Sequence, residues 1–494
     1  MKKIPHILAA CFLIIIAFIG CNKNEDDLSS NPTPTTIDFS KVEIQDFIWE
    51  GLNTYYLWKD NVPNLADTKD DLNDSYFNYL NSYTDPNVFF ESLLYDRNNV
   101  DVYSWIVDDY VALENSFNGI LKSNGVKYRI SYESGSNTDV LGYVRYILPN
   151  SDAYGKDVQR GYVFDAIDGQ QLTTNNYQSL LAQDTYTMNF ADLNGGNPIS
   201  NGKSVELTQV ENFVENPVYI AKTLDVNGTK IGYIMYNGFD AGFEAELTNA
   251  FAQIKADGAT ELILDLRYNS GGYGYVAVDI ASLITGQFKG QVLSKEKWNS
   301  QWQTWYEENH PDWIEKYFDD KFYIDGNPIN GMNLNKLYVI TTGSTASASE
   351  LLISGLDAYI DVSTIGTTTY GKYTGSVTIY DSDNFQKSGA NLNTNHTWAM
   401  QPIVLQYTNK NGETVKGGMY PDTEVIEYVS QFAELGNINE PLLAATLELI
   451  TGVAGKGISK KSGKDLIKLK ELPMENKFEN ILIFDKELPF LRKK

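Results

Sequence analysis

A strand that ends in a serine-rich turn and then a helix constrains this chain more than any other feature. Residues 337–341 (LYVIT) form a short apolar, β-branched run that is typical of a buried strand. Small residues follow at 342–345, and an apolar pattern with helical spacing begins at Ser349. Ser347 is therefore expected beside a helix N-terminus, where unpaired backbone N–H groups favour developing negative charge.

Two interpretations of Ser347 are open on this stretch alone. A serine before a helix usually caps it, because its side-chain oxygen accepts a hydrogen bond from the backbone. Lys372, which lies 25 residues further along after a second β-branched run, favours another interpretation. A serine hydroxyl becomes a nucleophile when a base takes its proton, and a lysine can be that base if burial lowers its pKa.

This stretch resembles the S41 family of serine peptidases, the C-terminal processing or tail-specific proteases. The family has a Ser-Ala-Ser-Glu turn between a strand and a helix, and Gly-Lys after the next strand. The resemblance implies that Ser347, rather than Ser349, is the nucleophile and that Lys372 is the base. Several members orient the lysine with a glutamine four residues later, where this chain has Ser376. Others use a glutamate that Glu350 matches, although Glu350 equally suits the first turn of a helix.

Two glycines after another predicted strand complete the expected site. Residues 262–266 form a buried strand, and the segment RYNSGG follows at 267–272. The resemblance implies that Gly271 or Gly272 donates a backbone N–H to an oxyanion hole, with Ala348 as the second donor. The loss of one such donor typically costs ~3–4 kcal/mol of transition-state stabilisation.

Residues 116–213 consist of short alternating runs with turn signals, which predict a small β domain. The segment 160–169 ends in Asp-Gly and predicts a hairpin. This region resembles a PDZ domain, which binds an extended peptide as an added strand. The resemblance implies that Phe117, Gly119 and Ile120 belong to its peptide-binding loop, and an unrelated small β domain is the alternative.

The regions on either side have different patterns. Residues 38–115 carry aromatic residues at helical spacing and predict a helical N-terminal domain. Strands and helices alternate over 217–452, which predicts an α/β core, and the resemblance implies a core of the ClpP/crotonase-like type. The aromatic insertion at 289–335 is expected to serve for packing, with a lid or a substrate-side wall as the alternatives. The basic, aliphatic C-terminal tail, 453–494, predicts no defined element.

The chain begins with the features of an exported protein. Residues 1–20 combine two lysines, an apolar run and a final Gly20, which predicts a signal peptide. The segment FIGC resembles a bacterial lipobox and implies that Cys21 is acylated, with an ordinary secretory signal or an uncleaved anchor as the alternatives. Residues 21–37 predict a flexible, lipid-anchored linker. We expect attachment to the bilayer of the bacterial outer membrane, at its periplasmic face or at the cell surface.

Composition argues against several function classes. A formal net charge of −25 disfavours binding to nucleic acid, whose phosphates require a basic surface. Outside the signal peptide only His310 and His396 occur, and neither has a partner at zinc-ligand spacing. The resemblance likewise implies no metal and no cofactor. Two hypotheses remain: a serine endopeptidase that uses a Ser-Lys dyad on polypeptides, and a non-catalytic surface lipoprotein that binds peptide or glycan.

Overall fold

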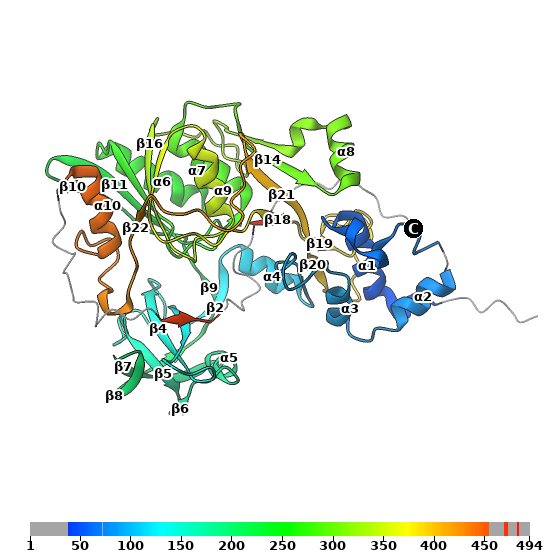
Figure 1. Ribbon diagram of the computed structural model, residues 1–494, viewed down its shortest axis with the longest axis horizontal. Coiled ribbons are helices and arrows are strands. Elements are labelled where there is room, and N and C mark those ends of the chain that lie inside the picture. Colours follow the sequence, from blue (N-terminus) through cyan, green and yellow to red (C-terminus); the bar gives the residue numbers. More distant parts are fainter. Residues whose placement is uncertain (1–37, 72, 454–468, 473–481, 484–494) are drawn as a thin grey trace, which may run out of the picture.

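The computed structural model describes residues 38–71, 73–453, 469–472 and 482–483. It has three parts, which Figure 1 shows as an α/β core on the left, a β domain beneath the core and a group of helices on the right. The predicted signal peptide and linker, including Cys21, lie outside the described residues. Among the helices of the described ranges, none is both long and apolar enough to cross a membrane.

The α/β core is built on a sheet of six strands in the order β10-β11-β12-β16-β17-β22. Its strands are β10 (Val218–Val226), β11 (Thr229–Tyr236), β12 (Glu261–Asp265), β16 (Lys336–Thr341), β17 (Asp361–Gly366) and β22 (Thr423–Glu424). All neighbours from β11 onward are parallel, and β10 is antiparallel to β11. The strands β11, β12 and β16 are each followed by a helix: α6 (Glu244–Ala256), α7 (Gly274–Thr285) and α9 (Ala348–Asp357). The predicted α/β architecture is therefore confirmed.

The two faces of this sheet are both buried, because alternate side chains of each strand enter different clusters. On β11, Ile234 and Tyr236 pack into the cluster that contains α6, α7 and α9. Tyr233 and Met235 instead pack against α10 (Pro441–Thr451), which covers the opposite face. This arrangement fixes the carboxyl ends of the strands, where the predicted site residues lie.

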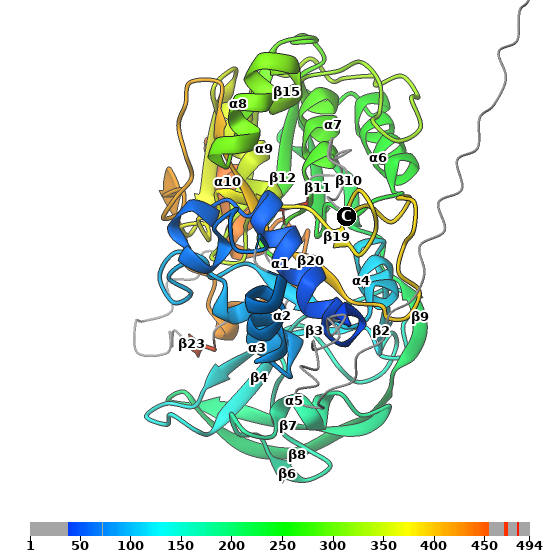
Figure 2. The ribbon, with the colours of Figure 1, turned by 90° about the vertical axis from the view of Figure 1, so that its right-hand side faces the viewer.

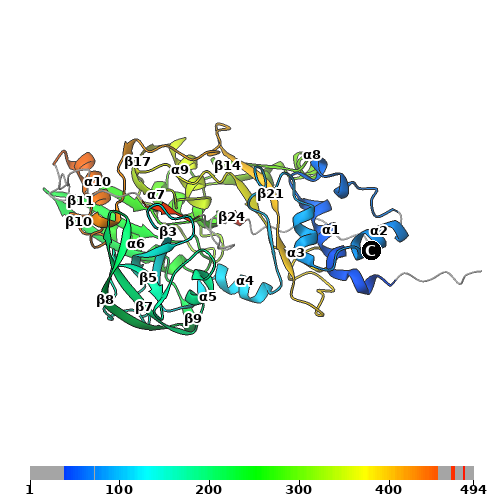
Figure 3. The same cartoon turned by 60° about the horizontal axis from the view of Figure 1, so that its bottom comes forward.

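A second sheet lies beside the first in the core, in the order β13-β24-β18-β21-β14-β15. Its strands are β13 (Gly272–Tyr273), β24 (Leu482–Ile483), β18 (Thr374–Ser376), β21 (Ile403–Asn409), β14 (Val292–Trp298) and β15 (Glu315–Tyr317). The strand β24 belongs to the C-terminal tail, for which the sequence predicted no element. Figure 3 shows β24 near the middle of the molecule, between the core and α4 (Tyr110–Phe117).

The N-terminal region is helical, as predicted, but other parts of the chain join it. Its helices are η1 (Phe39–Val42), α1 (Glu43–Tyr55), η2 (Lys59–Asn61), η3 (Pro63–Leu65), α2 (Asn73–Asn81) and α3 (Pro86–Ser92). The strand β1 (Trp105–Val107) pairs with β20 (Ala399–Gln401), which in turn pairs with β19 (Ile379–Tyr380). The segment 374–409 is therefore divided between two sheets, because the chain leaves the core sheet after β18 to form this small sheet and returns to the core at β21.

The aromatic insertion also packs against the N-terminal helices. It contains α8 (Ser300–Asn309) and η4 (Pro311–Ile314) between β14 and β15. The indole N–H of Trp302 donates to the carbonyl oxygen of Thr54 at 2.8 Å, and the Trp302 ring stacks on Tyr55 with centroids 5.5 Å apart. These buried contacts give the insertion a packing role.

The β domain has a sheet in the order β23-β3-β4-β5-β7-β8, seen at the bottom of Figure 2. Its elements are β2 (Ile120–Ser123), β3 (Val126–Tyr132), β4 (Val140–Ile147), β5 (Val163–Ile167), β6 (Gln170–Gln171), α5 (Tyr177–Leu181), β7 (Thr185–Asn194), β8 (Asn197–Thr208), β9 (Val210–Val214) and β23 (Lys470–Glu471). The predicted hairpin is present: Asp168 and Gly169, both with positive φ, join β5 to β6. The edge strand β23 comes from the C-terminal tail.

A buried ionic cluster joins the core to the β domain. The fully buried guanidinium of Arg267 donates to Asp265, to Glu440 at the start of α10, and to Glu427. Arg160 of the β domain donates to the same Glu427 at 2.6 Å. Burial alone would raise the pKa of Glu427, but the two guanidinium groups hold it at about 2. These hydrogen bonds hold Arg267 in place and so position the start of the glycine segment that follows it.

Candidate active site

The predicted strand, turn and helix around Ser347 are present, and the turn is strained. β16 ends at Thr341, and Ser347 immediately precedes α9. Its φ of 64° and ψ of −112° are unusual for a residue with a side chain, and such conformations cost of order 1–3 kcal/mol. Ser347 and Glu350 occupy the positions of a capping box, but the buried Ser347 hydroxyl has no hydrogen-bond partner among the described residues. The interpretation of Ser347 as a helix cap requires its hydroxyl oxygen to accept a backbone hydrogen bond. Ser347 Oγ accepts none from the described residues.

The carboxylate of Glu350 joins the serine turn to the loop that carries Lys372, between β17 and β18. Its Oε2 accepts the backbone N–H of Ser347 at 2.8 Å and that of Lys372 at 2.9 Å. Its Oε1 accepts the N–H of Gly371 at 2.6 Å and the hydroxyl of Thr369 at 2.5 Å. Burial raises the pKa of Glu350 to about 7, and these four hydrogen bonds act in the opposite direction. Because backbone N–H groups can only donate, the contacts favour the ionised carboxylate.

Lys372 is buried beside this carboxylate. Burial lowers the pKa of Lys372 to about 7, against the opposing influence of Asp101 and Glu350. Its Nζ lies 5.0 Å from the ring centre of Tyr103. An ordinary lysine, with a pKa near 10.4, would be almost wholly protonated at neutral pH. In this environment, by contrast, a substantial fraction of the amine is neutral and able to accept a proton.

A tyrosine that the sequence did not identify makes a second connection between the two residues. The hydroxyl of Tyr407, on β21, lies 2.9 Å from the carbonyl oxygen of Lys372 and 3.2 Å from that of Ser347. Asp101 and Tyr103, which also lie near the amine, come from the segment after α3. No spacing relative to Ser347 predicts these contacts, because they depend on how distant elements pack.

The two predicted oxyanion glycines have backbone conformations that suit glycine alone. Gly271 and Gly272 have φ of 112° and 137°, and a Cβ on Gly272 would overlap the carbonyl of Phe239. The N–H of Gly271 donates to Asn269 Oδ1 at 2.9 Å, so of the predicted pair Gly272 is the better candidate donor. Ala348 is the first residue of α9, and no described residue accepts its N–H.

Two of the three predicted peptide-binding residues lie next to these glycines. Phe117 and Gly119 line a cavity of about 210 Å³ together with Gly271 and Gly272. Ile120 instead begins β2, which pairs with β9. The cavity therefore joins the β domain to the glycine segment of the core.

The two histidines have packing contacts elsewhere. His396 Nε2 lies 3.0 Å from Asp381 Oδ2, and the His310 ring stacks on Trp313 with centroids 4.1 Å apart. Within the described part of the chain, no three His, Cys, Asp or Glu side chains gather as metal ligands. Neither histidine contacts the Ser347 hydroxyl.

The buried lysine predicts a pH-dependent stability. Since its folded pKa of about 7 lies below its ordinary value, the unfolded chain binds more protons between pH 7 and 10.5. The free energy of unfolding should therefore rise with pH across this window. Lys372→Met should stabilise the protein by roughly 2–5 kcal/mol at pH 6 and by progressively less toward pH 10.5, measured by urea denaturation.

Glu350 is present in both proteins, so its own titration cancels to first order in this difference. Lys297→Met, at an exposed position of β14, is the matched control and should show no such pH-dependent difference. A Lys372→Met effect that is constant from pH 6 to 10 would contradict the lowered pKa.

Known protein families match the part of the chain that contains this site. The profile of Peptidase family S41 matches residues 230–425, and that of the Peptidase S41 N-terminal domain matches residues 43–105. Together they span just over half of the chain, and the first includes the glycine segment, Ser347 and Lys372.

Several relatives are also similar over long stretches. The carboxyl-terminal-processing protease of Picosynechococcus sp. is 26% identical over 347 residues, which cover 70% of this chain and 74% of the relative. The chloroplastic C-terminal processing peptidase of Tetradesmus obliquus is 24% identical over 260 residues, about half of each chain. A crystal structure from Bacteroides fragilis, described as an S41 protease, shares the fold with a TM-score of 0.61 at 24% identity, covering 82% of this chain and 97% of that one. Given these matches, the chain belongs to peptidase family S41 and is a serine peptidase of the kind that uses a Ser-Lys dyad.

Proposed function

We propose that the protein is a serine endopeptidase in which Ser347 is the nucleophile and Lys372 is the general base. The observation that carries this assignment is the buried Ser347 hydroxyl, which no described residue pairs, on a strained turn that Glu350 and Tyr407 both connect to Lys372. A non-catalytic binding protein, the other hypothesis, has no use for an unpaired hydroxyl beside a lysine of lowered pKa.

In the first step, Ser347 Oγ attacks the carbonyl carbon of the scissile peptide bond while neutral Lys372 Nζ takes the hydroxyl proton. The carbonyl oxygen becomes negative, and we assign the N–H groups of Ala348 and Gly272 as the donors that stabilise it. The N-terminal end of α9 adds a favourable dipole at the same place. The protonated amine then gives its proton to the leaving nitrogen, and the C–N bond breaks to leave an acyl-enzyme.

In the second step, a water molecule replaces the leaving peptide. Lys372, neutral again, takes a proton from this water as it attacks the ester carbonyl. Collapse of the intermediate releases the new C-terminal carboxylate, and the proton on Lys372 returns to Ser347 Oγ. The same buried amine serves as base and acid, because a pKa near 7 lets it exchange protons in both directions at neutral pH.

The substrates we propose are exported polypeptides whose C-termini are captured by the PDZ-like β domain. The support is positional: Phe117 and Gly119, at the end of α4, share a cavity with the two glycines of the core. An extended chain that leaves the β domain here would be close to the proposed nucleophile. Main-chain pairing would provide affinity with little dependence on side chains.

We also propose that acylation of Cys21 anchors the protein to the outer membrane. The support is the apolar segment and lipobox-like residues that precede this cysteine, and the polar residues that follow it. The arrangement would place the peptidase among other exported proteins.

Substitution of the proposed dyad should abolish peptidase activity. Ser347→Ala and Lys372→Ala should each lower kcat by about 10⁴-fold or more, and the double variant should lose little beyond either single variant, because the two groups act as a unit. Lys372→Arg should be equally inactive, since arginine keeps its proton in a protein. Activity is measured by release of peptide fragments from a denatured protein substrate, with circular dichroism as the control for folding. Turnover by Ser347→Ala at the wild-type rate would refute the mechanism.

If acylated Cys21 is the membrane anchor, its removal should change the location of the protein without changing its peptidase activity. Cys21→Ser should release the protein from membranes and abolish incorporation of a labelled fatty acid, while the activity of the released protein is retained. Fractionation and metabolic labelling in a bacterial host provide the measurement. Unchanged membrane retention and labelling of the Cys21→Ser protein would rule out this anchor.

A further inference from the structure

We propose that the C-terminal tail is an intramolecular ligand of the polypeptide-binding path and restrains the peptidase by occupying it. This proposal rests on the function proposed above, because it assigns an occupant to the same site. Two short tail segments carry it: β23, which adds to the β domain, and β24, which lies between the two halves of the proposed catalytic site.

The first segment binds the β domain as a peptide strand would. β23 is antiparallel to β3 at the edge of the sheet, and the N–H of Leu472 donates to the carbonyl oxygen of Ile130 at 3.0 Å. The Leu472 side chain is buried in the core of the domain. Arg129 donates to the Leu472 carbonyl and to the Glu471 carboxylate, both at 3.0 Å. Backbone pairing at an open edge with one side chain in an apolar pocket is how strand addition recognises a peptide.

The Glu471 carboxylate has further partners in the domain. The hydroxyl of Tyr143 donates to Glu471 Oε1, and Arg145 lies 3.7 Å from the same oxygen. Burial alone would raise the pKa of Glu471, but Arg145, Tyr143 and Arg129 together lower it. The groove thus selects an acidic residue followed by an apolar one.

The second segment occupies the place where a substrate strand would bind. Gly272 and Tyr273 of β13 pair with Leu482 and Ile483 of β24, and Ser376 of β18 pairs with Ile483. β13 contains the proposed oxyanion glycine, and β18 begins two residues after Lys372. An edge of Gly272 that pairs with the tail is not open to a substrate strand. The tail strand β24 and a substrate strand therefore cannot pair with Gly272 at the same time.

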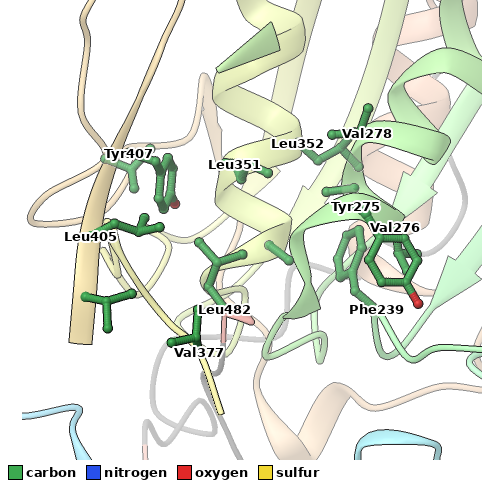
Figure 4. Packing of buried hydrophobic residues seen from close by; sticks show 14 of the residues in the cluster. Phe239, Tyr275, Val276, Val278, Leu351, Leu352, Val377, Leu405, Tyr407 and Leu482 are labelled. Carbon is green, nitrogen blue, oxygen red and sulfur yellow. The ribbon is translucent and has the colours of Figure 1, made fainter. Parts of the chain in front are cut away.

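Apolar contacts hold this second segment firmly. The Leu482 side chain is fully buried, and Figure 4 shows it between Leu351 of α9 and Val377. Ile483 packs with Trp105 and Phe117 and lines the cavity that contains the two glycines. The Ser376 hydroxyl donates to the Leu482 carbonyl at 3.3 Å. The site therefore accepts an extended segment with two consecutive apolar residues, and we assign the same preference to substrates.

Charge also favours retention of the tail. Residues 454–494 contain 11 Lys and Arg and 6 Asp and Glu, a net charge of +5, so with −25 for the whole chain the other residues carry −30. Long-range attraction of this kind weakens as salt is added. Because the two segments belong to one chain, weakening either should also lower the occupancy of the other.

The test uses the full-length protein with one change in the groove. Glu471→Lys removes the contacts to Arg129, Arg145 and Tyr143 and should raise kcat/KM on a short peptide substrate roughly three- to tenfold, since a larger fraction of the sites becomes open. Added salt should reduce the difference. Glu308→Lys, the same charge change at an exposed position of α8 whose side chain forms no hydrogen bond or ion pair with the described residues, should leave kcat/KM unchanged.

Leu482→Asp, in the second tail segment β24, should also raise kcat/KM on the short peptide substrate. A tail strand that only stabilises the fold predicts the opposite sign, because both variants would then lower activity together with the melting temperature. Equal or lower kcat/KM in both variants would overturn the proposal.

A binding measurement separates this proposal from the proposed function. In the Ser347→Ala background, which cannot turn over, a fluorescein-labelled peptide of residues 470–494 should bind several-fold more tightly when the chain's own tail carries Glu471→Lys. Fluorescence anisotropy reports this without any peptidase activity. If no variant cleaves peptides but this difference is found, the catalytic assignment fails and the tail site stands. If peptides are cleaved but the difference is absent, the tail proposal fails alone.

Discussion

The hydrogen bonds to one buried carboxylate, Glu350, hold the proposed catalytic residues in place. Its Oε2 accepts the backbone N–H of Ser347, which precedes α9, and that of Lys372, which lies in the loop between β17 and β18. Without this acceptor, several buried N–H groups would lose their partner, at a cost of about 1–3 kcal/mol each. The strained conformation of Ser347 is kept because its N–H is tied to the helix that follows it.

The chemistry of the site depends on burial more than on any single contact. Burial lowers the pKa of Lys372 and raises that of Glu350, and both end near 7. Above about pH 7, the favoured state therefore has a neutral Lys372 amine beside an ionised Glu350 carboxylate. Burial of these two ionisable groups lowers the free energy of unfolding, as is common at active sites. Tyr103 and Tyr407 are among the residues that pack around the buried Lys372 and Glu350, and this burial maintains both shifts.

The local patterns in the sequence predicted much of this arrangement, because the chemistry lies on regular elements. The β-branched run before Ser347, the segment from Asp265 to Gly272, and the Asp-Gly hairpin of the β domain were each identified from residues close together in the chain. The roles of Tyr407 and Asp101 could not be predicted, since they depend on contacts between distant elements. The strands β23 and β24 were missed for a related reason: each has only two residues, which is too short for a periodic pattern.

Covalent labelling of the intact protein by a fluorophosphonate probe, followed across pH, reports on Ser347 and Lys372 together. Mass spectrometry should find the adduct on Ser347, and the labelling rate should rise with pH, with a midpoint near 7, as Lys372 loses its proton. In Glu350→Gln, loss of the neighbouring negative charge should move that midpoint to lower pH, because Glu350 raises the pKa of Lys372. An adduct on another residue, or a rate that does not change between pH 5 and pH 10, would rule out Ser347 as the nucleophile or Lys372 as its base.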